Sequence, residues 1–156
     1  MEKLVRIVVV FAILLMATMA SAKDFSAWVL GNDTSLDIRL GYCLSENTEV
    51  GAECVWLKQN NIPQTWGAYG LFKLPDTVKF PNPIPLDFLP KEFTATPYIG
   101  VQTGLSFDKQ GTYVGPIAGL VIEKILVIEY FYISSDFQLK EVNQNQGVRI
   151  GFAFRF

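Results

Sequence analysis

The sequence contains no histidine. This absence excludes Ser-His-Asp and Cys-His catalytic arrangements and removes the commonest metal ligand of proteins. Only two cysteines are present, too few for a structural zinc site without histidine partners. No CxxC motif and no Gly-rich phosphate loop occur. We therefore expect a non-enzymatic protein with no cofactor and no metal site.

Strong net charge and long apolar runs are also missing beyond the first residues. Removing Glu2, Lys3 and Arg6 from the 13 basic and 15 acidic residues leaves a net charge of −3. This charge is too small and too scattered to suggest a nucleic-acid partner. The most apolar later stretch, 113–133, is broken by Gly115-Pro116 and carries charge in its middle, which argues against a membrane helix.

The first 22 residues have the pattern of a secretory signal. Lys3 and Arg6 precede an apolar run over 7–20, and Ala20-Ser21-Ala22 offers the small residues of a cleavage site. The run is shorter than the roughly 20 residues that span a bilayer, although a retained membrane anchor stays the alternative. We expect a signal peptide over 1–22 and one domain over 23–156.

The rest of the chain alternates between apolar and small or polar residues, which is typical of strands. Polar or Gly/Pro-rich turns separate these segments. Eight strands are predicted, over 25–31, 36–44, 48–58, 65–74, 94–107, 112–122, 125–133 and 147–156. The connection 75–93 contains five prolines, and it forms a stiff link, hides another strand or folds against the barrel. Residues 134–146 are predicted to form the longest loop at the other end.

The two faces of these strands decide between two kinds of barrel. In 147–156, Val148, Ile150 and three phenylalanines oppose two glycines, an alanine and two arginines. A soluble barrel would place the bulky face inside, and a transmembrane barrel would place it against lipid. A narrow eight-stranded barrel has little interior room, which favours the small and polar face inside. Aromatic residues would then form interface girdles, or core contacts in the soluble alternative: Trp28, Trp56, Trp66, Tyr130 and Tyr132.

Charged residues on the small and polar face form the candidate site. They are Asp37, Arg39, Glu53, Glu129, Arg149 and Arg155. One interpretation makes Glu53 or Glu129 a catalytic carboxylate; the favoured one makes all six a paired network that fills the lumen. Pairing Leu44 with Val50 predicts that Glu53 lies diagonal to Arg39. Cys43 and Cys54 fall on opposite faces, which disfavours a disulfide unless the register is shifted.

The last strand carries a further pattern, Arg149-x-Gly151-x-x-Phe154-x-Phe156. It resembles the C-terminal signature of bacterial outer-membrane β-barrel proteins, and the segment 38–57 is similar to hairpins of the small eight-stranded ones. The resemblance implies an all-β fold: a closed, antiparallel, up-and-down transmembrane β-barrel of about eight strands. It also implies contact with outer-membrane lipids and with the barrel assembly machinery, which would read Arg149, Gly151, Phe154 and Phe156.

We therefore expect a monomer in the bacterial outer membrane, exported through a cleaved signal peptide. Its lumen would be packed and polar, and its role would be structural or in surface interactions. Two alternatives remain open: a soluble exported β-barrel that binds a small apolar ligand, and a lipid-modifying outer-membrane enzyme.

Overall fold

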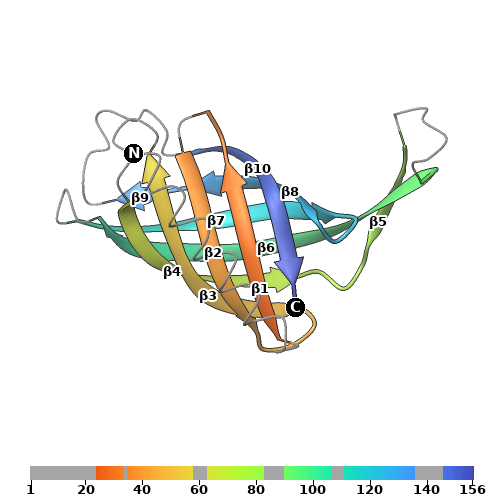
Figure 1. Cartoon of the computed structure of the whole chain (residues 1–156), viewed down its shortest axis with the longest axis horizontal. Coiled ribbons are helices and arrows are strands. Elements are labelled where there is room, and N and C mark those ends of the chain that lie inside the picture. The colour runs from red at the N-terminus through yellow and green to blue at the C-terminus, as the bar shows by residue number, and fades with distance from the viewer. Residues whose placement is uncertain (1–23, 34, 58–62, 83–89, 107–110, 136–145) are drawn as a thin grey trace, which may run out of the picture.

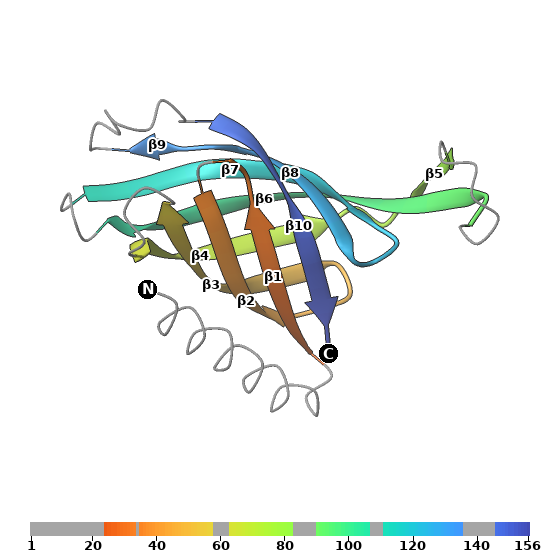
Figure 2. The same ribbon diagram turned by 45° about the horizontal axis from the view of Figure 1, so that its top comes forward.

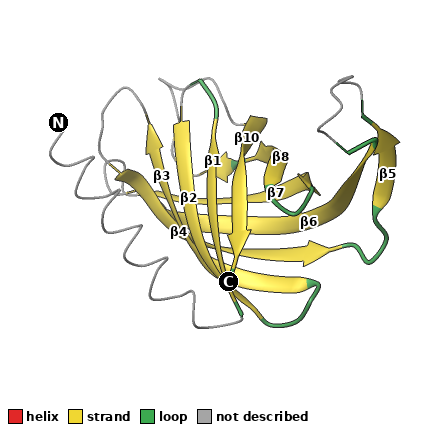
Figure 3. Ribbon diagram, turned by 45° about the vertical axis from the view of Figure 1, so that its right-hand side comes forward, coloured by secondary structure: helices red, strands yellow, loops and turns green. Residues whose placement is uncertain are grey.

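The computed structural model describes residues 24–33, 35–57, 63–82, 90–106, 111–135 and 146–156. The predicted signal peptide lies outside these ranges. Every regular element among them is a β-strand (Figure 3). None of the described residues forms a helix long and apolar enough to cross a membrane.

Eight strands close into an antiparallel barrel, which confirms the predicted strand number and pairing. Each barrel strand pairs with its neighbours along the chain, and β1 pairs with β10 to close the sheet (Figure 1). The barrel strands are β1 (Phe25–Gly31), β2 (Ser35–Cys43), β3 (Thr48–Leu57), β4 (Pro63–Lys73), β6 (Glu92–Ser106), β7 (Gly111–Ile122), β8 (Leu126–Tyr132) and β10 (Gln146–Arg155).

Short polar turns join neighbouring strands because local side chains satisfy the backbone. Between β1 and β2, Asn32 Oδ1 accepts hydrogen bonds from the Ser35 amide and hydroxyl. Between β2 and β3, Ser45 Oγ accepts hydrogen bonds from the amides of Asn47 and Thr48. These are the side-chain contacts that turn residues commonly make, and they fix where each strand begins.

The β2–β3 register differs from the predicted one by two residues. Tyr42, not Leu44, lies opposite Val50, and Arg39 lies directly opposite Glu53. The turn is tighter than expected, because the amides of Leu44 and Ser45 both donate to the Thr48 carbonyl. A shift by two keeps every side chain on its predicted face, so the predicted lumen face is unchanged.

Pro116 lies within β7, a position that the sequence pattern disfavours. The pairing of β7 with β8 ends at Ile117 opposite Phe131, and the ladder of β7 resumes with β9 (Ser134–Ser135) at Val114. The interruption falls at Pro116 and Gly115, where proline offers no amide to the neighbouring strand. The strand therefore accommodates proline by a local gap in the ladder without changing register.

A short strand within the connection 75–93 extends the sheet beyond the barrel. Strand β5 (Val78–Pro81) pairs with the first residues of β6 and projects from the barrel end (Figures 1 and 2). The rings of Phe80 and Phe93 lie 5.7 Å apart across this pair. Of the three arrangements expected for this connection, the hidden strand is present over 78–81, and residues 83–89 lie outside the described ranges.

The turn between β7 and β8 is hydrogen-bonded to the part of β6 that pairs with β5. Glu123 Oε1 accepts hydrogen bonds from the Thr94 amide (2.6 Å) and hydroxyl (3.0 Å), and these bonds lower the pKa of the Glu123 carboxyl. Glu123 and Lys124 both have positive φ angles, 50° and 64°, which residues other than glycine rarely adopt. The turn thus keeps a strained backbone at the end of the barrel that carries β5.

Candidate functional site

The barrel differs from an ordinary soluble domain in two ways: charged side chains lie in its interior beside apolar ones such as Leu30, Leu71 and Val127, and apolar side chains are exposed on its outside. The inward positions of the strands hold the buried polar side chains: Ser26, Asp37, Arg39, Glu49, Glu53, Gln102, Glu129 and Arg149. The outward positions expose apolar side chains, with 57 % of Ile150 and 51 % of Phe152 accessible. The interior is therefore the part of the molecule where polar chemistry is concentrated.

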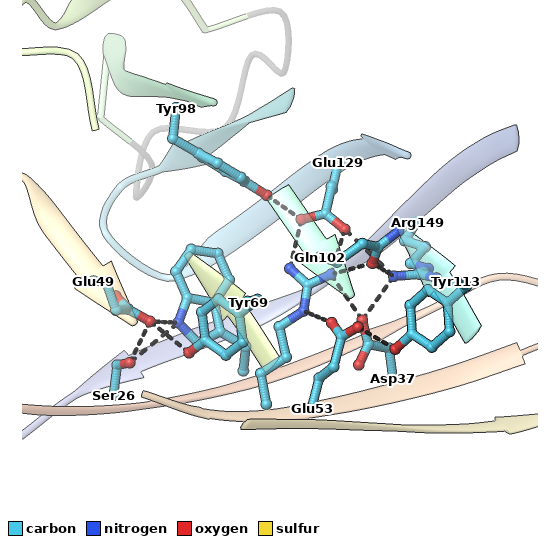
Figure 4. Close-up of polar contacts among 12 residues, drawn as sticks. Ser26, Asp37, Glu49, Glu53, Tyr69, Tyr98, Gln102, Tyr113, Glu129 and Arg149 are labelled. Carbon is cyan, nitrogen blue, oxygen red and sulfur yellow. Dashed lines mark hydrogen bonds and ion pairs between the residues drawn. The ribbon is translucent and has the colours of Figure 1, made fainter. Parts of the chain in front are cut away.

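Arg39 is the centre of the larger group of charges, which we call the central cluster: Asp37, Arg39, Glu53, Gln102, Glu129 and Arg149. Arg39 donates two hydrogen bonds to Glu129, at 2.6 and 2.9 Å. Its Nε lies 3.2 Å from Glu53 Oε2, and its Nη2 lies 2.9 Å from Asp37 Oδ2. One guanidinium thus contacts three carboxylates that belong to three different strands (Figure 4).

Arg149 connects the last strand to the same cluster. Its Nη1 lies 2.7 Å from Asp37 Oδ2 and 3.6 Å from Glu129 Oε1. The guanidinium carbon lies 3.9 Å from the centroid of the Phe131 ring, within the range of a cation–π contact. Gln102 Oε1 accepts long hydrogen bonds, 3.4 Å each, from Arg39 and Arg149. The cluster therefore joins β2, β3, β6, β8 and β10 across the barrel.

A second group lies nearer the barrel end where the described chain ends, and we call it the Glu49 cluster: Ser26, Trp28, Glu49, Tyr69 and Lys73. Glu49 Oε1 accepts hydrogen bonds from Ser26 Oγ (2.5 Å), Trp28 Nε1 (2.7 Å) and Tyr69 Oη (2.8 Å). Glu49 Oε2 accepts one from Lys73 Nζ at 3.2 Å. A single buried carboxylate is thus surrounded by donors.

A tyrosine hydroxyl group is hydrogen-bonded to each of the three interior glutamates. Tyr69 bonds to Glu49, Tyr98 to Glu129 at 2.9 Å, and Tyr113 to Glu53 at 2.5 Å. These pairs belong to both clusters, and the tyrosines come from β4, β6 and β7. The interior is therefore organised by repeated tyrosine–glutamate pairs as much as by ion pairs.

Glycines on neighbouring strands make room for these tyrosine rings. A Cβ added at Gly104 would lie 2.5 Å from the Tyr113 ring, and one at Gly119 would lie 2.6 Å from the Tyr98 ring. A Cβ at Gly41 would lie 2.3 Å from the Tyr69 hydroxyl. Since real Cβ atoms do not approach so closely, each ring needs the absence of a side chain beside it.

Five of the six predicted lumen charges meet in the central cluster. The sixth, Arg155, is exposed at the end of β10 and takes no part in the central cluster. Arg155 has the inward position in the alternation, but it is the last strand residue. Alternation alone therefore gives the face of a residue and not its depth along the barrel.

Several interior residues were missed or misplaced by sequence reasoning. Glu49 lies four positions before Glu53 on β3 and therefore shares its face, so the alternation could have identified it. Trp28 was expected in an interface girdle, but it lies inside the barrel with 1 % of its surface exposed. Of the other expected girdle residues, Trp66, Tyr130 and Tyr132 are exposed, at 52 %, 48 % and 42 %.

The four residues of the terminal pattern lie along β10 and its end. Gly151 lies opposite Leu30, and a Cβ there would lie 1.9 Å from the Val29 carbonyl oxygen. Glycine is thus required for the close approach of β10 to β1 where the barrel closes. Phe154 is exposed on the outer face, and the Phe156 amide donates to the Phe25 carbonyl at 2.9 Å.

Cys43 and Cys54 are both free and buried, so the disulfide that was left open does not form. No group of three or more histidine, cysteine, aspartate or glutamate side chains in the described ranges is placed to hold a metal ion. No protein-family model, curated protein or solved structure matches the chain.

Proposed function

We propose that this chain is a monomeric, non-enzymatic β-barrel protein of a bacterial outer membrane, with a role in the structure or the surface interactions of that membrane. The observation that carries the proposal is the distribution of side chains in the closed barrel. Apolar side chains cover its outside, and paired charges occupy its inside. This distribution suits a barrel surrounded by lipid.

The outer wall supports the membrane location. Exposed aliphatic and aromatic side chains follow one another along neighbouring strands, for example Ile99, Val101 and Leu105 on β6 and Val148, Ile150 and Phe152 on β10. In water such a continuous apolar wall would drive association. A closed barrel also leaves no unpaired edge in its wall, as a bilayer requires.

The polar interior counts against the soluble alternative. A soluble barrel that binds a small apolar ligand needs an apolar interior. Here Asp37, Arg39, Glu53, Glu129 and Arg149 meet in the interior and bond to one another. Their mutual bonds also support a structural role over a catalytic one, because the carboxylates are engaged by guanidinium and hydroxyl groups.

The strand directions support an orientation in the membrane. One end of the barrel carries the C-terminal end of β10, the two short turns β2–β3 and β7–β8, and the β5 extension. We assign this end to the periplasm. The resemblance of Arg149, Gly151, Phe154 and Phe156 to the outer-membrane signature then makes the assembly machinery a proposed partner during insertion.

Fractionation of expressing cells tests the proposal. The parent protein should stay with the outer membrane after alkaline washing and should need detergent for release. Phe154→Lys on the outer face should lower the folded, heat-modifiable fraction more than Ala153→Lys on the inner face, since a lipid-facing lysine is unfavourable, by about 1 kcal/mol or less near the interface and by about 2–4 kcal/mol at mid-membrane depth. Recovery of the parent protein in the soluble periplasm without detergent would reject the membrane proposal.

A further inference from the structure

The charges of the central cluster do not balance. Three carboxylates, of Asp37, Glu53 and Glu129, face two guanidinium groups, of Arg39 and Arg149. All five side chains are at most 2 % exposed. Among the described residues, the fully ionised cluster would thus carry one excess negative charge in the barrel interior.

An uncompensated charge in such a place is costly. Desolvation of a buried ion without a partner costs far more than a hydrogen bond returns, so the group normally becomes neutral instead. The described residues offer no set of ligands for a metal cation. A single bound proton on one carboxyl group neutralises the cluster without any further component.

The contacts of the three carboxyl groups distinguish between them. Glu129 receives two bonds from Arg39 and lies 3.6 Å from Arg149, and Asp37 receives close contacts from both arginines, at 2.9 and 2.7 Å. Glu53 has one guanidinium contact, at 3.2 Å, the longest of the contacts that Arg39 makes to the three carboxylates. Its negative charge is therefore the least stabilised.

A protonated carboxyl group also needs an acceptor for its hydrogen. Asp37 Oδ1 is buried and has no hydrogen-bond partner, so a proton there would have nothing to bond to. Glu53 Oε1 lies 2.5 Å from the Tyr113 hydroxyl oxygen, which can accept as well as donate. Oε2 of Glu53 stays free to accept from Arg39.

We propose that the Glu53 carboxyl group holds a proton at neutral pH and shares it with the Tyr113 hydroxyl oxygen. The proton lies on Oε1 and points to the Tyr113 hydroxyl oxygen, and the hydrogen of that hydroxyl group turns away from Glu53. The titratable and charged groups that face Glu53 are Arg39 and Asp37 of β2 and Tyr113 of β7, with Arg149 of β10 further away.

This assignment makes the barrel interior a proton-binding site that is closed off from bulk water. It concerns the interior alone and holds whether or not the barrel lies in a membrane. With the proton bound, the two arginines are matched by Asp37 and Glu129, and the interior carries no net charge from the central cluster. The packed lumen then needs no counter-ion from outside.

Infrared difference spectroscopy of the purified, folded protein at neutral pH is the direct test. The parent protein should show the carbonyl stretch of a protonated carboxylic acid, and Glu53→Gln should lose it. Glu46→Gln, at an exposed position in the β2–β3 turn, should keep the band and serves as the control. Absence of the band from the parent protein, or its persistence in Glu53→Gln, would overturn the assignment.

Stability provides a second, independent readout. Glutamine has the shape of neutral glutamate, and its amide can donate to Tyr113 while its oxygen accepts from Arg39. Glu53→Gln should therefore change the unfolding equilibrium constant by less than about tenfold, whereas Glu129→Gln, which removes a true charge, should raise it by about a hundredfold or more. Equal losses in the two variants would contradict a neutral Glu53.

Discussion

The two interior clusters satisfy buried carboxylates in different ways. In the Glu49 cluster, one carboxylate has three donors from neutral side chains and one lysine, and that lysine is 18 % exposed. In the central cluster, three carboxyl groups meet two arginines, and each of the five side chains is at most 2 % exposed.

This difference follows from depth. Near the barrel end, Lys73 can keep its ammonium group partly hydrated, and the remaining donors need no charge of their own. In the middle, only fixed partners are within reach, so guanidinium groups and a retained proton have to neutralise the carboxylates. The Arg39 guanidinium lies 5.3 Å from the centroid of the Tyr69 ring, so the two clusters touch without sharing a charge.

Removing the central cation should have the largest effect. Arg39→Met leaves Asp37, Glu53 and Glu129 with Arg149 alone, and we expect a loss of about 3–5 kcal/mol in the free energy of unfolding. Lys73→Met is the matched change in the Glu49 cluster. It should cost only about 1 kcal/mol, because Lys73 is partly hydrated and three other donors remain. Urea unfolding in detergent or lipid measures both, and similar losses would remove the distinction between the clusters.

The three tyrosine–glutamate pairs sharpen the comparison. Hydrogen bonds to a charged group contribute more than those to a neutral one, so Tyr69→Phe and Tyr98→Phe should each cost about 1.5–3 kcal/mol. Tyr113→Phe faces the neutral Glu53 and should cost only about 0.5–1.5 kcal/mol. The three variants remove the same hydroxyl group, so each is a control for the others. A loss at Tyr113 as large as that at Tyr98 would indicate an ionised Glu53.

The next largest loss of stability is expected from a substitution at Gly41, which lies beside the side chains of the Glu49 cluster. Gly41→Ala places a methyl group against Tyr69, Glu49 and Ser26, within 2.5 Å of each, and we expect a loss of about 1–3 kcal/mol from overpacking. Gly70→Ala is the control on the outer wall. Its Cβ would meet no atom closer than 4.0 Å, and folding should be unaffected or slightly favoured. Equal behaviour of the two alanine variants would show that the cluster adapts freely.

The smallest effect is expected outside both clusters. Lys124 has a left-handed backbone conformation in the β7–β8 turn, which is unfavourable for a residue with a Cβ atom. Lys124→Gly removes this strain and should stabilise the barrel by about 1 kcal/mol. Glu123 and its bonds to Thr94 are left in place. The same substitution combined with Arg39→Met should add its gain independently, since the turn shares no contact with the central cluster. A loss of stability would instead mean that the lysine side chain supports the turn.

Sequence alternation predicted most of the barrel, for a physical reason. A strand repeats every two residues, so the inward positions of Asp37, Arg39, Glu53, Glu129 and Arg149 follow directly from the pattern. Depth and partners do not follow from it. Arg155 has the right face but lies at the exposed strand end, and Trp28 was assigned to the outside although its alternation places it within.

The contacts across the lumen could not be predicted from the sequence for a different reason. Which tyrosine meets which glutamate depends on the stagger between strands that are not neighbours, as with Tyr113 of β7 and Glu53 of β3. The β2–β3 register depended on a turn in which hydrogen bonds among Leu44, Ser45, Asn47 and Thr48 fix a tighter pairing than expected. β5 was hidden by the prolines around it, because they suggested a stiff connection.

The central claim, a barrel with its apolar wall in lipid, is tested most directly by tryptophan fluorescence with brominated acyl chains. Trp66 lies on the outer wall and Trp28 lies in the interior. In vesicles of brominated lipid, the parent protein should be strongly quenched, whereas Trp56→Phe/Trp66→Phe, which keeps only Trp28, should be quenched little. No quenching of the parent protein, or equal quenching of both proteins, would contradict the account.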